Sequence, residues 1–132
     1  MKSMTIKDTY PVQAINITKD EARFANTQEI IDYLEDKIKS HPVATYIATF
    51  DHYTHTKNLP EHAMDEKIID VKLVVFCFGK ELPIPEIASV RPRSIAVVEH
   101  KDDFVISFLD APNPQAHDTM TAWVKGVKKE EN

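Results

Sequence analysis

The chain has 132 residues, of which 42 % are hydrophobic and 28 % charged, and its formal net charge is −5 at pH 7. This length predicts one domain, residues 1–132, that buries about two thirds of its unfolded surface and needs no disulfide or metal to fold. The acidic charge argues against a nucleic-acid-binding protein, because binding phosphates needs a basic surface.

The glycine and cysteine counts and the longest apolar segment exclude further classes of protein. With two glycines, the chain can form neither a phosphate-binding loop nor a dinucleotide fingerprint, so we expect no nucleotide cofactor. The longest apolar run, Leu73–Phe78, is shorter than the about 20 residues of a membrane span and the roughly 7–15 of a secretory signal. The one cysteine, Cys77, allows no disulfide within the chain and fits a reducing compartment. We therefore predict a cytoplasmic protein with no membrane contact.

The first half of the chain predicts two strands and two helices after a frayed lead-in at residues 1–10. Val12–Thr18 is short, alternating and rich in β-branched residues, which is typical of a strand. In Thr27–Ser40, apolar residues recur at helical spacing behind a capping asparagine. A strand at Val43–Asp51 follows, and then a short helix at Pro60–Glu66, whose proline suits the first helical turn.

Ile68–Phe78 is predicted to be a central strand. Its first half has one polar face, with Asp70 and Lys72, whereas its second half, from Leu73 onward, is apolar on both faces. A strand that is apolar on both faces needs cover on both. The final helix or a second subunit could supply the second cover, and the sequence leaves both alternatives open.

The rest of the chain predicts a closing hairpin and a last helix. Strands Arg93–His100 and Phe104–Asp110 are separated by a three-residue turn, and the helix begins at Asn113 and ends before a tail at residues 130–132. The order of elements is thus β-α-β-(short α)-β-β-β-α. We predict an α+β fold with a five-stranded, mostly antiparallel sheet and two main helices packed largely on one face.

Several of these segments resemble the bacterial family called domain of unknown function 302. Ile47–His52 is similar to that family's strand ending in aspartate-histidine, and Leu73–Lys80 is similar to its apolar strand ending in a glycine turn. Arg91-Pro92 and the hairpin that ends in Phe104–Pro112 resemble its closing segment. The resemblance covers residues 28–112. It implies a small, dimeric α+β protein with an antiparallel sheet, and it brings no established activity.

A histidine-rich loop at residues 52–66 is the first candidate site. Imidazole is a good ligand for transition metals, and a neighbouring carboxylate can bind or orient the ring. If Pro60–Glu66 is helical, His62 and Glu66 are four residues apart and share one face of that helix. A site of three imidazoles and a carboxylate is then possible. The sequence therefore predicts either a metal or haem site or a polar surface loop in which the aspartate is a structural cap. The residues of the metal hypothesis are His52, His55 and His62, with Asp51 and Glu66 as further ligands.

Arg91 and Arg93 form the second candidate site, for an anionic small-molecule ligand. Side chains two residues apart in an extended segment point to the same side. Two guanidinium groups there could bind a carboxylate or phosphate through paired hydrogen bonds. The alternative is a pair of surface ion pairs with the many acidic side chains of this protein.

The sequence offers no candidate catalytic residues. Cys77 lies near the end of the central strand without the cationic neighbours that activate a thiol, and we expect it to be a buried apolar residue. The serines lack a nucleophile motif. We therefore predict a small cytoplasmic module that binds a ligand or partner, is homodimeric and is not itself an enzyme. Metal or haem binding and anion binding are the alternatives.

Overall fold

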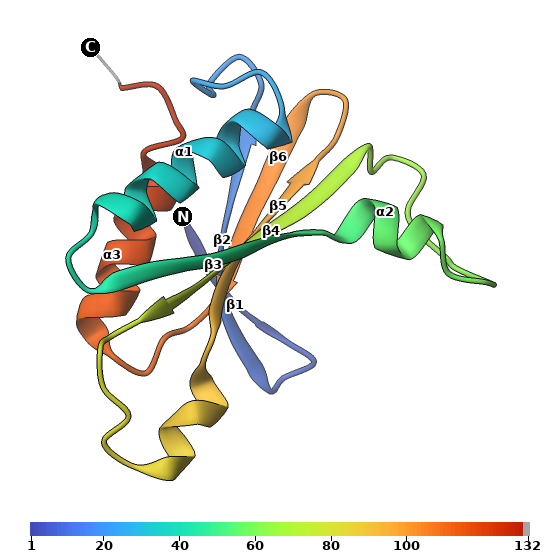
Figure 1. The fold of residues 1–132 in the computed structure, drawn as a ribbon. Coiled ribbons are helices and arrows are strands. Elements are labelled where there is room, and N and C mark those ends of the chain that lie inside the picture. Colours follow the sequence, from blue (N-terminus) through green and yellow to red (C-terminus); the bar gives the residue numbers. More distant parts are fainter. Residues whose placement is uncertain (131–132) are drawn as a thin grey trace.

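Six strands and two long helices build the α+β fold of the computed structural model, which describes residues 1–130 (Figure 1). The fold class is as predicted, with one strand more than expected, and every neighbouring pair in the strand order β1-β2-β6-β5-β4-β3 is antiparallel. Residues 131 and 132 of the predicted tail lie outside the described part. Within that part, no helix combines the length and the apolar character needed to cross a membrane. The elements are β1 (Lys2–Ile6), β2 (Tyr10–Thr18), α1 (Thr27–Ser40), β3 (Ala44–Asp51), α2 (His52–Lys57), β4 (Asp70–Phe78), the 3-10 helix η1 (Pro85–Val90), β5 (Arg93–Glu99), β6 (Asp103–Leu109) and α3 (Pro114–Lys125).

Helix α1 has the bounds that the sequence predicts. Asn26 caps it, because its side-chain oxygen accepts a hydrogen bond of 2.9 Å from the backbone amide of Glu29. The apolar side chains at helical spacing all face the sheet and are almost completely buried, and these are Ile30, Ile31, Leu34 and Ile38. The periodicity of the sequence thus identified the helix and its packing face.

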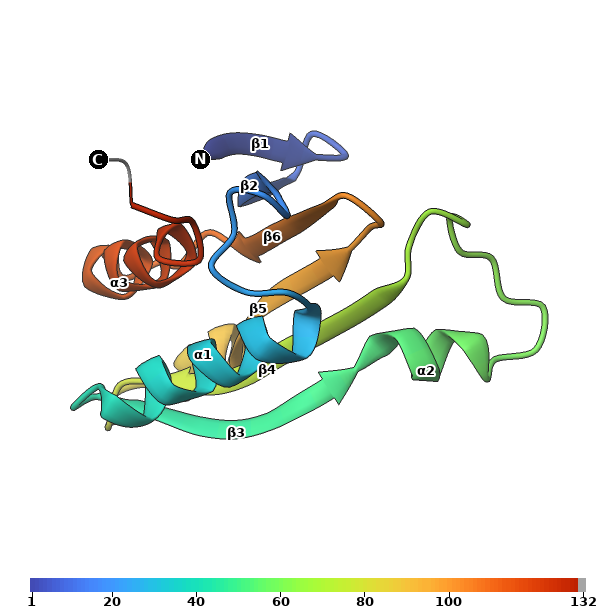
Figure 2. The same cartoon turned by 90° about the horizontal axis from the view of Figure 1, so that it is seen from above.

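Helices α1 and α3 lie on the same side of the sheet and cover one of its faces (Figure 2). The strand residues on this face form the core, in which Val74 stands opposite Ile95 and Phe76 packs against Trp123 of α3 with ring centroids 5.8 Å apart. We call this side the covered face. Its buried strand residues are Ile17, Val74, Phe76, Ile95, Val97, Phe104, Ile106 and Phe108.

The other side of the same strands carries neither α1 nor α3, and we call it the open face. Cys77 of β4 lies there and is half-buried, which corrects the expectation of a buried thiol. The reason is that the two helices cover the face of Val74 and Phe76 rather than the face of Leu73 and Cys77. By strand register, the open face consists of Lys2, Met4, Ile6, Tyr10, Val12, Ala14, Asn16, Thr18, Thr45, Ala48, Phe50, Val71, Leu73, Val75, Cys77, Ser94, Ala96, Val98, Asp103, Val105, Ser107 and Leu109.

The lead-in at residues 1–10 is not frayed, since it contains the edge strand β1, which pairs with β2. The turn between these strands holds Lys7 at φ 53° and Asp8 at φ 55°. Both values lie in the left-handed region, where a hairpin turn commonly uses asparagine, aspartate or glycine. Asp8 is such a residue, but Lys7 is not, and with this weak turn signal the sixth strand was missed.

The short helix predicted at Pro60–Glu66 is wrong, and a helix stands instead at His52–Lys57, directly after β3. Asp51 starts this helix as its cap. Residues 58–66 are turns and irregular chain, and Glu61 has φ 56°, which a right-handed helix does not allow. A capping aspartate decided the position of the helix, and the proline did not.

Candidate functional site

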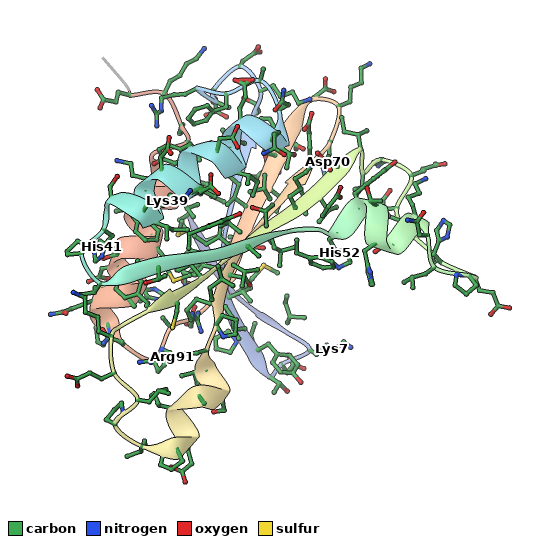
Figure 3. The ribbon with its side chains drawn as sticks, in the orientation of Figure 1. Lys7, Lys39, His41, His52, Asp70 and Arg91 are labelled. Atoms are coloured by element: carbon green, nitrogen blue, oxygen red, sulfur yellow. The ribbon has the colours of Figure 1, made fainter. Side chains whose placement is uncertain are left out.

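Arg91 and Arg93 line one small cavity of about 100 Å³. Arg91 lies at the junction of η1 and β5 (Figure 3), and β5 begins at Arg93. Both side chains reach this cavity. The remaining walls come from β4, η1 and the start of α3, and are mostly apolar: Phe78, Ile87, Val90, Ala111, Pro112, Asn113 and Ala116.

Both guanidinium groups are held by backbone carbonyls. Nη1 of Arg91 donates a hydrogen bond of 2.6 Å to the carbonyl oxygen of Glu81, and Nη2 of Arg93 donates to the carbonyl oxygen of Leu109. Nη2 of Arg91 also lies against Gly79, where a Cβ would come within 3.0 Å of it and where φ is +109°. These contacts fix the two cations without neutralising them, because a carbonyl carries no full charge.

The charges of the two arginines have no carboxylate partner within residues 1–130. None of the five ion pairs in that part of the chain includes Arg91 or Arg93. Nε of Arg93 is buried and has no hydrogen-bond partner there. Burial holds the pKa of Arg93 below its ordinary value, while the charge of Asp110 acts in the opposite direction. The surface ion pairs of the alternative hypothesis are therefore not formed at these two residues.

The start of α3 adds apolar surface to the cavity but no free backbone amide. Pro114 at the first helical position has no N–H, and the side chain of Asn113 accepts hydrogen bonds from the amides of Gln115 at 2.8 Å and Ala116 at 3.3 Å. The amide of His117 donates to the carbonyl of Asn113. The arginines are therefore the cationic donors of this cavity.

The histidines of the loop at residues 52–66 separate into a pair and a single residue. His52 and His55 lie on α2 with ring centroids 6.0 Å apart, and both rings also contact Phe50. His62 donates from Nδ1 to the carbonyl oxygen of Leu59 at 3.0 Å, and Glu66 is exposed in irregular chain. Within residues 1–130 no three histidine, cysteine or acidic side chains come close enough to hold one metal ion. Metal or haem binding by this loop stays a prediction that has at most a histidine pair to build on.

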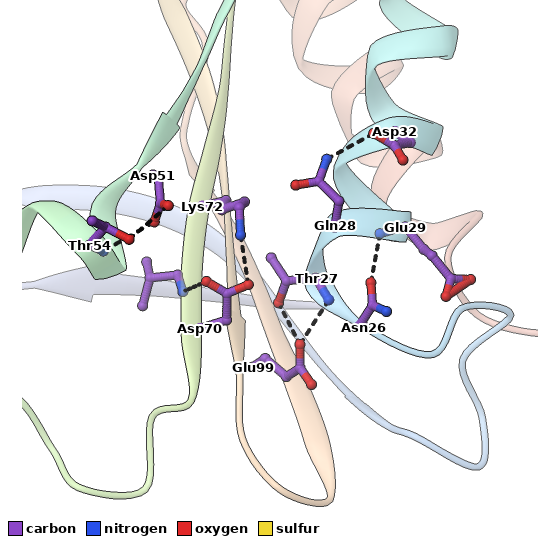
Figure 4. Close-up of polar contacts among 11 residues, drawn as sticks. Asn26, Thr27, Gln28, Glu29, Asp32, Asp51, Thr54, Asp70, Lys72 and Glu99 are labelled. Carbon is purple, nitrogen blue, oxygen red and sulfur yellow. Dashed lines mark hydrogen bonds and ion pairs between the residues drawn. The ribbon is translucent and has the colours of Figure 1, made fainter.

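Asp51, named as a further metal ligand, caps α2 (Figure 4). Its carboxylate accepts hydrogen bonds from the amide and the hydroxyl of Thr54, at 3.1 and 2.9 Å. These bonds lower the pKa of Asp51 below its ordinary value. The geometry is that of the structural cap in the alternative hypothesis for this loop.

Glu99 is a buried carboxylate that the sequence did not single out. It accepts hydrogen bonds from the amide and hydroxyl of Thr27, at 2.8 and 2.9 Å, and from the ammonium of Lys19 at 2.7 Å (Figure 4 shows the two bonds to Thr27). Burial alone would raise the pKa of Glu99, but the bonds from Lys19 and Thr27 outweigh burial and lower it. Both hydrogen-bonding partners of Glu99, Lys19 and Thr27, are residues of the same domain. Glu99 thus joins the start of α1 to the end of β5, which is a structural role.

A wider hollow lies between α1 and the end of α3, and it is open to solvent. Arg23 there donates to the carbonyl oxygen of Gly126 at 2.7 Å, and Lys128 forms an ion pair of 3.1 Å with Glu21. Its cations are thus partly engaged within the fold, and its walls do not enclose a ligand.

The cavity walls beyond the two arginines are residues that the sequence analysis missed. They come from segments around residues 78, 87–90 and 111–116, which the fold alone brings together. The sequence carries a partial signal, because apolar residues stand close to Arg91 and Arg93 along the chain. No pattern within the chain indicates that the start of α3 closes the cavity.

The comparisons with known proteins give a family but no activity. The chain belongs to a family of unknown function (DUF6858), whose sequence model matches residues 1–129. This match corrects the resemblance to domain of unknown function 302, which it does not support specifically. No curated protein and no solved structure matches the chain significantly. Any function must therefore be argued from the residues themselves.

Proposed function

We propose that this protein is a cytoplasmic binding module without catalytic activity of its own, and that it binds a small carboxylate between Arg91 and Arg93. The observation that carries the proposal is the presence of two guanidinium groups without carboxylate partners at one cavity in residues 1–130. A protein with 21 acidic residues could neutralise such cations internally. Cations that are anchored but not neutralised are suited to bind an anion from solution.

The donor geometry favours an oxyanion. A guanidinium has five N–H donors in one plane, and it binds the two oxygens of a carboxylate side by side. Arg93 uses one donor on the carbonyl of Leu109 and leaves Nε without a partner. Because the buried Nε is closed to solvent, an oxyanion would accept from the remaining N–H groups of the two guanidinium groups.

The size and the walls of the cavity favour a short aliphatic carboxylate. At about 100 Å³ the cavity is suited to a small ligand. Phe78, Val90 and Pro112 offer apolar surface to an alkyl chain. A phosphate dianion has no apolar part to place there and would lose more hydration on entering.

The cytoplasmic location and the lack of catalytic activity are the two parts of the proposal that rest on the sequence. A single cysteine fits the reducing environment of the cytoplasm. The absence of a nucleophile motif supports a binding role over a catalytic one. Neither point identifies the ligand beyond its chemical class.

Thermal and calorimetric titration with acetate, propionate and butyrate tests the proposal at constant ionic strength, with chloride as the reference anion. We expect butyrate to stabilise the folded protein by about 2.7 kcal/mol when its concentration is about 100 times Kd. Arg93→Met and Arg91→Met should each abolish this gain. Arg23→Met is the matched control, because Arg23 also donates to a backbone carbonyl but lies in a different hollow.

Two results would overturn the proposal. One is the absence of stabilisation by any of the three carboxylates. The other is equal stabilisation of the wild type and both cavity variants. Stabilisation by phosphate as strong as that by butyrate would contradict the choice of a carboxylate.

A further inference from the structure

The open face of the sheet is apolar although neither long helix covers it. An antiparallel sheet with one solvated face normally alternates apolar residues toward the core with polar residues toward water. Here β4 presents Val71, Leu73 and Val75 to the open face, and β5 and β6 add Val98 and Val105. Five large side chains on this face are 38–53 % exposed, and they are Met4, Ile6, Tyr10, Phe50 and Leu109.

Charge is nearly absent from the same surface. Among its strand residues, charged side chains occur at two peripheral positions, Lys2 on the edge strand β1 and Asp103 at the start of β6. Asp103 is already engaged, since it pairs with His100 at 2.7 Å and accepts from Asn16 at 3.1 Å. A protein with 28 % charged residues has thus kept charge away from the middle of one whole sheet face. Depletion of charge is the compositional mark of an interface centre.

We propose that the open face is the interface of a homodimer in which two copies stack sheet against sheet about a twofold axis. A twofold interface brings one surface patch onto the same patch of the second copy, so the patch must be complementary to itself. An uncharged, apolar patch meets this requirement. A charged one would set like charges against each other in two copies that each carry a net charge of −5.

The dimensions of the face fit such a contact. Six strands at about 4.8 Å spacing and roughly seven residues at about 3.3 Å each give a projected area of roughly 650 Å². A stable interface buries about 800 Å² of accessible surface per partner, which a face of this projected size can provide. An isolated helix from another protein would cover only about two fifths of this width, since a helix is about 10–12 Å across.

The sheet edges are less suited than the face to bind the second copy. The edge strand β3 has an irregular register between Tyr46 and Ala48, which interrupts the row of backbone groups that a new strand would need. The other edge, β1, has five residues, including Lys2. Stacking of the faces at about 10 Å therefore remains the favoured mode of association.

Leu73 and Ala96 of the dimer interface lie on the opposite side of the sheet from Arg93, although Leu109 at the margin of the open face accepts a hydrogen bond from Arg93 through its carbonyl. Arg93 shares the side of the sheet on which Phe76 and the helices lie, because it stands opposite Phe76 in the β4–β5 ladder. Loss of the dimer and loss of carboxylate binding can therefore be observed independently of each other.

Sedimentation velocity and native mass spectrometry at 1–100 μM test the interface. We expect the untagged wild type to have twice the 15.1 kDa mass of one chain. Leu73→Glu and Ala96→Glu should each raise the dimer Kd at least 100-fold, because each places two like charges in an apolar interface. Leu82→Glu is the matched control, since Leu82 is 67 % exposed and lies in a loop outside the face. Circular dichroism verifies that each variant is folded.

The native thiol gives a second measurement that does not depend on a charged variant. Cys77 lies on the open face and is the one cysteine of the chain. In the wild type, its rate of reaction with a disulfide reagent should rise as the protein is diluted through the dimer Kd. In Leu73→Glu the rate should be fast and independent of concentration.

A monomeric wild type at 100 μM would overturn the proposal and leave the face for a different partner. A dimer that persists in both glutamate variants, with thiol reactivity independent of dilution, would place the interface elsewhere.

Discussion

The covered face of the sheet carries charged side chains, whereas the open face carries almost none, and this is the reverse of the usual relation between burial and charge. On the covered face, the ammonium of Lys72 lies 2.8 Å from the carboxylate of Asp70 (Figure 4), and Glu99 is 6 % exposed. Arg93 lies there too and lines the cavity that it shares with Arg91. These groups stand toward the strand ends, and the apolar core occupies the middle of the face.

This comparison shows that the charge of a strand position does not tell which face the helices cover. Asp70 and Glu99 are tolerated beneath the helical layer because each has donors within hydrogen-bond distance. The open face has no such network at its centre and consists of side chains that gain by leaving water. The same sheet therefore offers one face completed within the chain and one whose apolar surface is still available.

The largest expected effect contrasts two phenylalanines, one on each face. Phe76→Ala removes a completely buried ring and should lower the free energy of unfolding by about 3–5 kcal/mol at every protein concentration. Phe50→Ala removes a ring that is 38 % exposed, and in the monomer we expect a loss of about 1 kcal/mol. Urea denaturation at 1 and 100 μM measures both.

The concentration dependence decides whether the open face behaves as an interface. The stability of a dimer rises with protein concentration, so Phe50→Ala should reduce this rise while Phe76→Ala leaves it unchanged. Equal losses for the two variants at both concentrations would contradict the distinction between the faces.

The sequence predicted most of the fold because its local signals agreed with the packing. Helix Thr27–Ser40 combined a capping asparagine with apolar residues at a spacing of three and four, and the hairpin between β5 and β6 combined alternation with a polar turn. The prediction of the sheet missed its first strand because the turn signal there is weak: Asp8 suits the left-handed conformation, but its neighbour is Lys7 and not glycine or asparagine. The position of the short helix was predicted wrongly because both Asp51 and Pro60 favour a helix start, and the helix begins directly after Asp51.

The candidate site could be predicted only in part. The spacing suggested that Arg91 and Arg93 act together, and both side chains line one cavity. The opposite wall comes from Ala111, Pro112 and Ala116, which are about 20 residues further along the chain. Their approach depends on how α3 returns over the sheet, and no local pattern encodes that contact.

Glu99 tests how the covered face accommodates a buried charge. Glu99→Gln should lower the free energy of unfolding by about 2 kcal/mol at pH 7, because the ion pair with Lys19 and the charge-assisted bonds from Thr27 are weakened. Chemical denaturation measures the loss. Lys101→Met is a control that removes a charge from the exposed turn beyond the same strand, and we expect it to change stability by less than about 0.5 kcal/mol.

The stability difference between the wild type and Glu99→Gln should depend on pH in a definite direction. The pKa of folded Glu99 lies below its ordinary value of 4.5, so its contribution is fully present above pH 4.5 and is lost as the pH falls through the lowered value. The difference in stability between the wild type and Glu99→Gln should therefore shrink below pH 4.5. A difference that grows on acidification would show that the carboxyl group is stabilised in its protonated form.

The smallest expected effect compares the caps of two helices, of which α1 covers the sheet and α2 does not. Asn26 starts α1, whose apolar side chains lie in the core, while Asp51 starts α2, which buries none of its residues. Loss of a cap typically costs about 1 kcal/mol, and the cost reaches global stability only if the helix is packed in the cooperative unit. Asn26→Ala should therefore lower the free energy of unfolding by about 1 kcal/mol. Asp51→Ala should change it by less than about 0.5 kcal/mol and accelerate hydrogen exchange within residues 52–57. A global loss as large for Asp51→Ala as for Asn26→Ala would mean that α2 belongs to the same cooperative unit as the covered face.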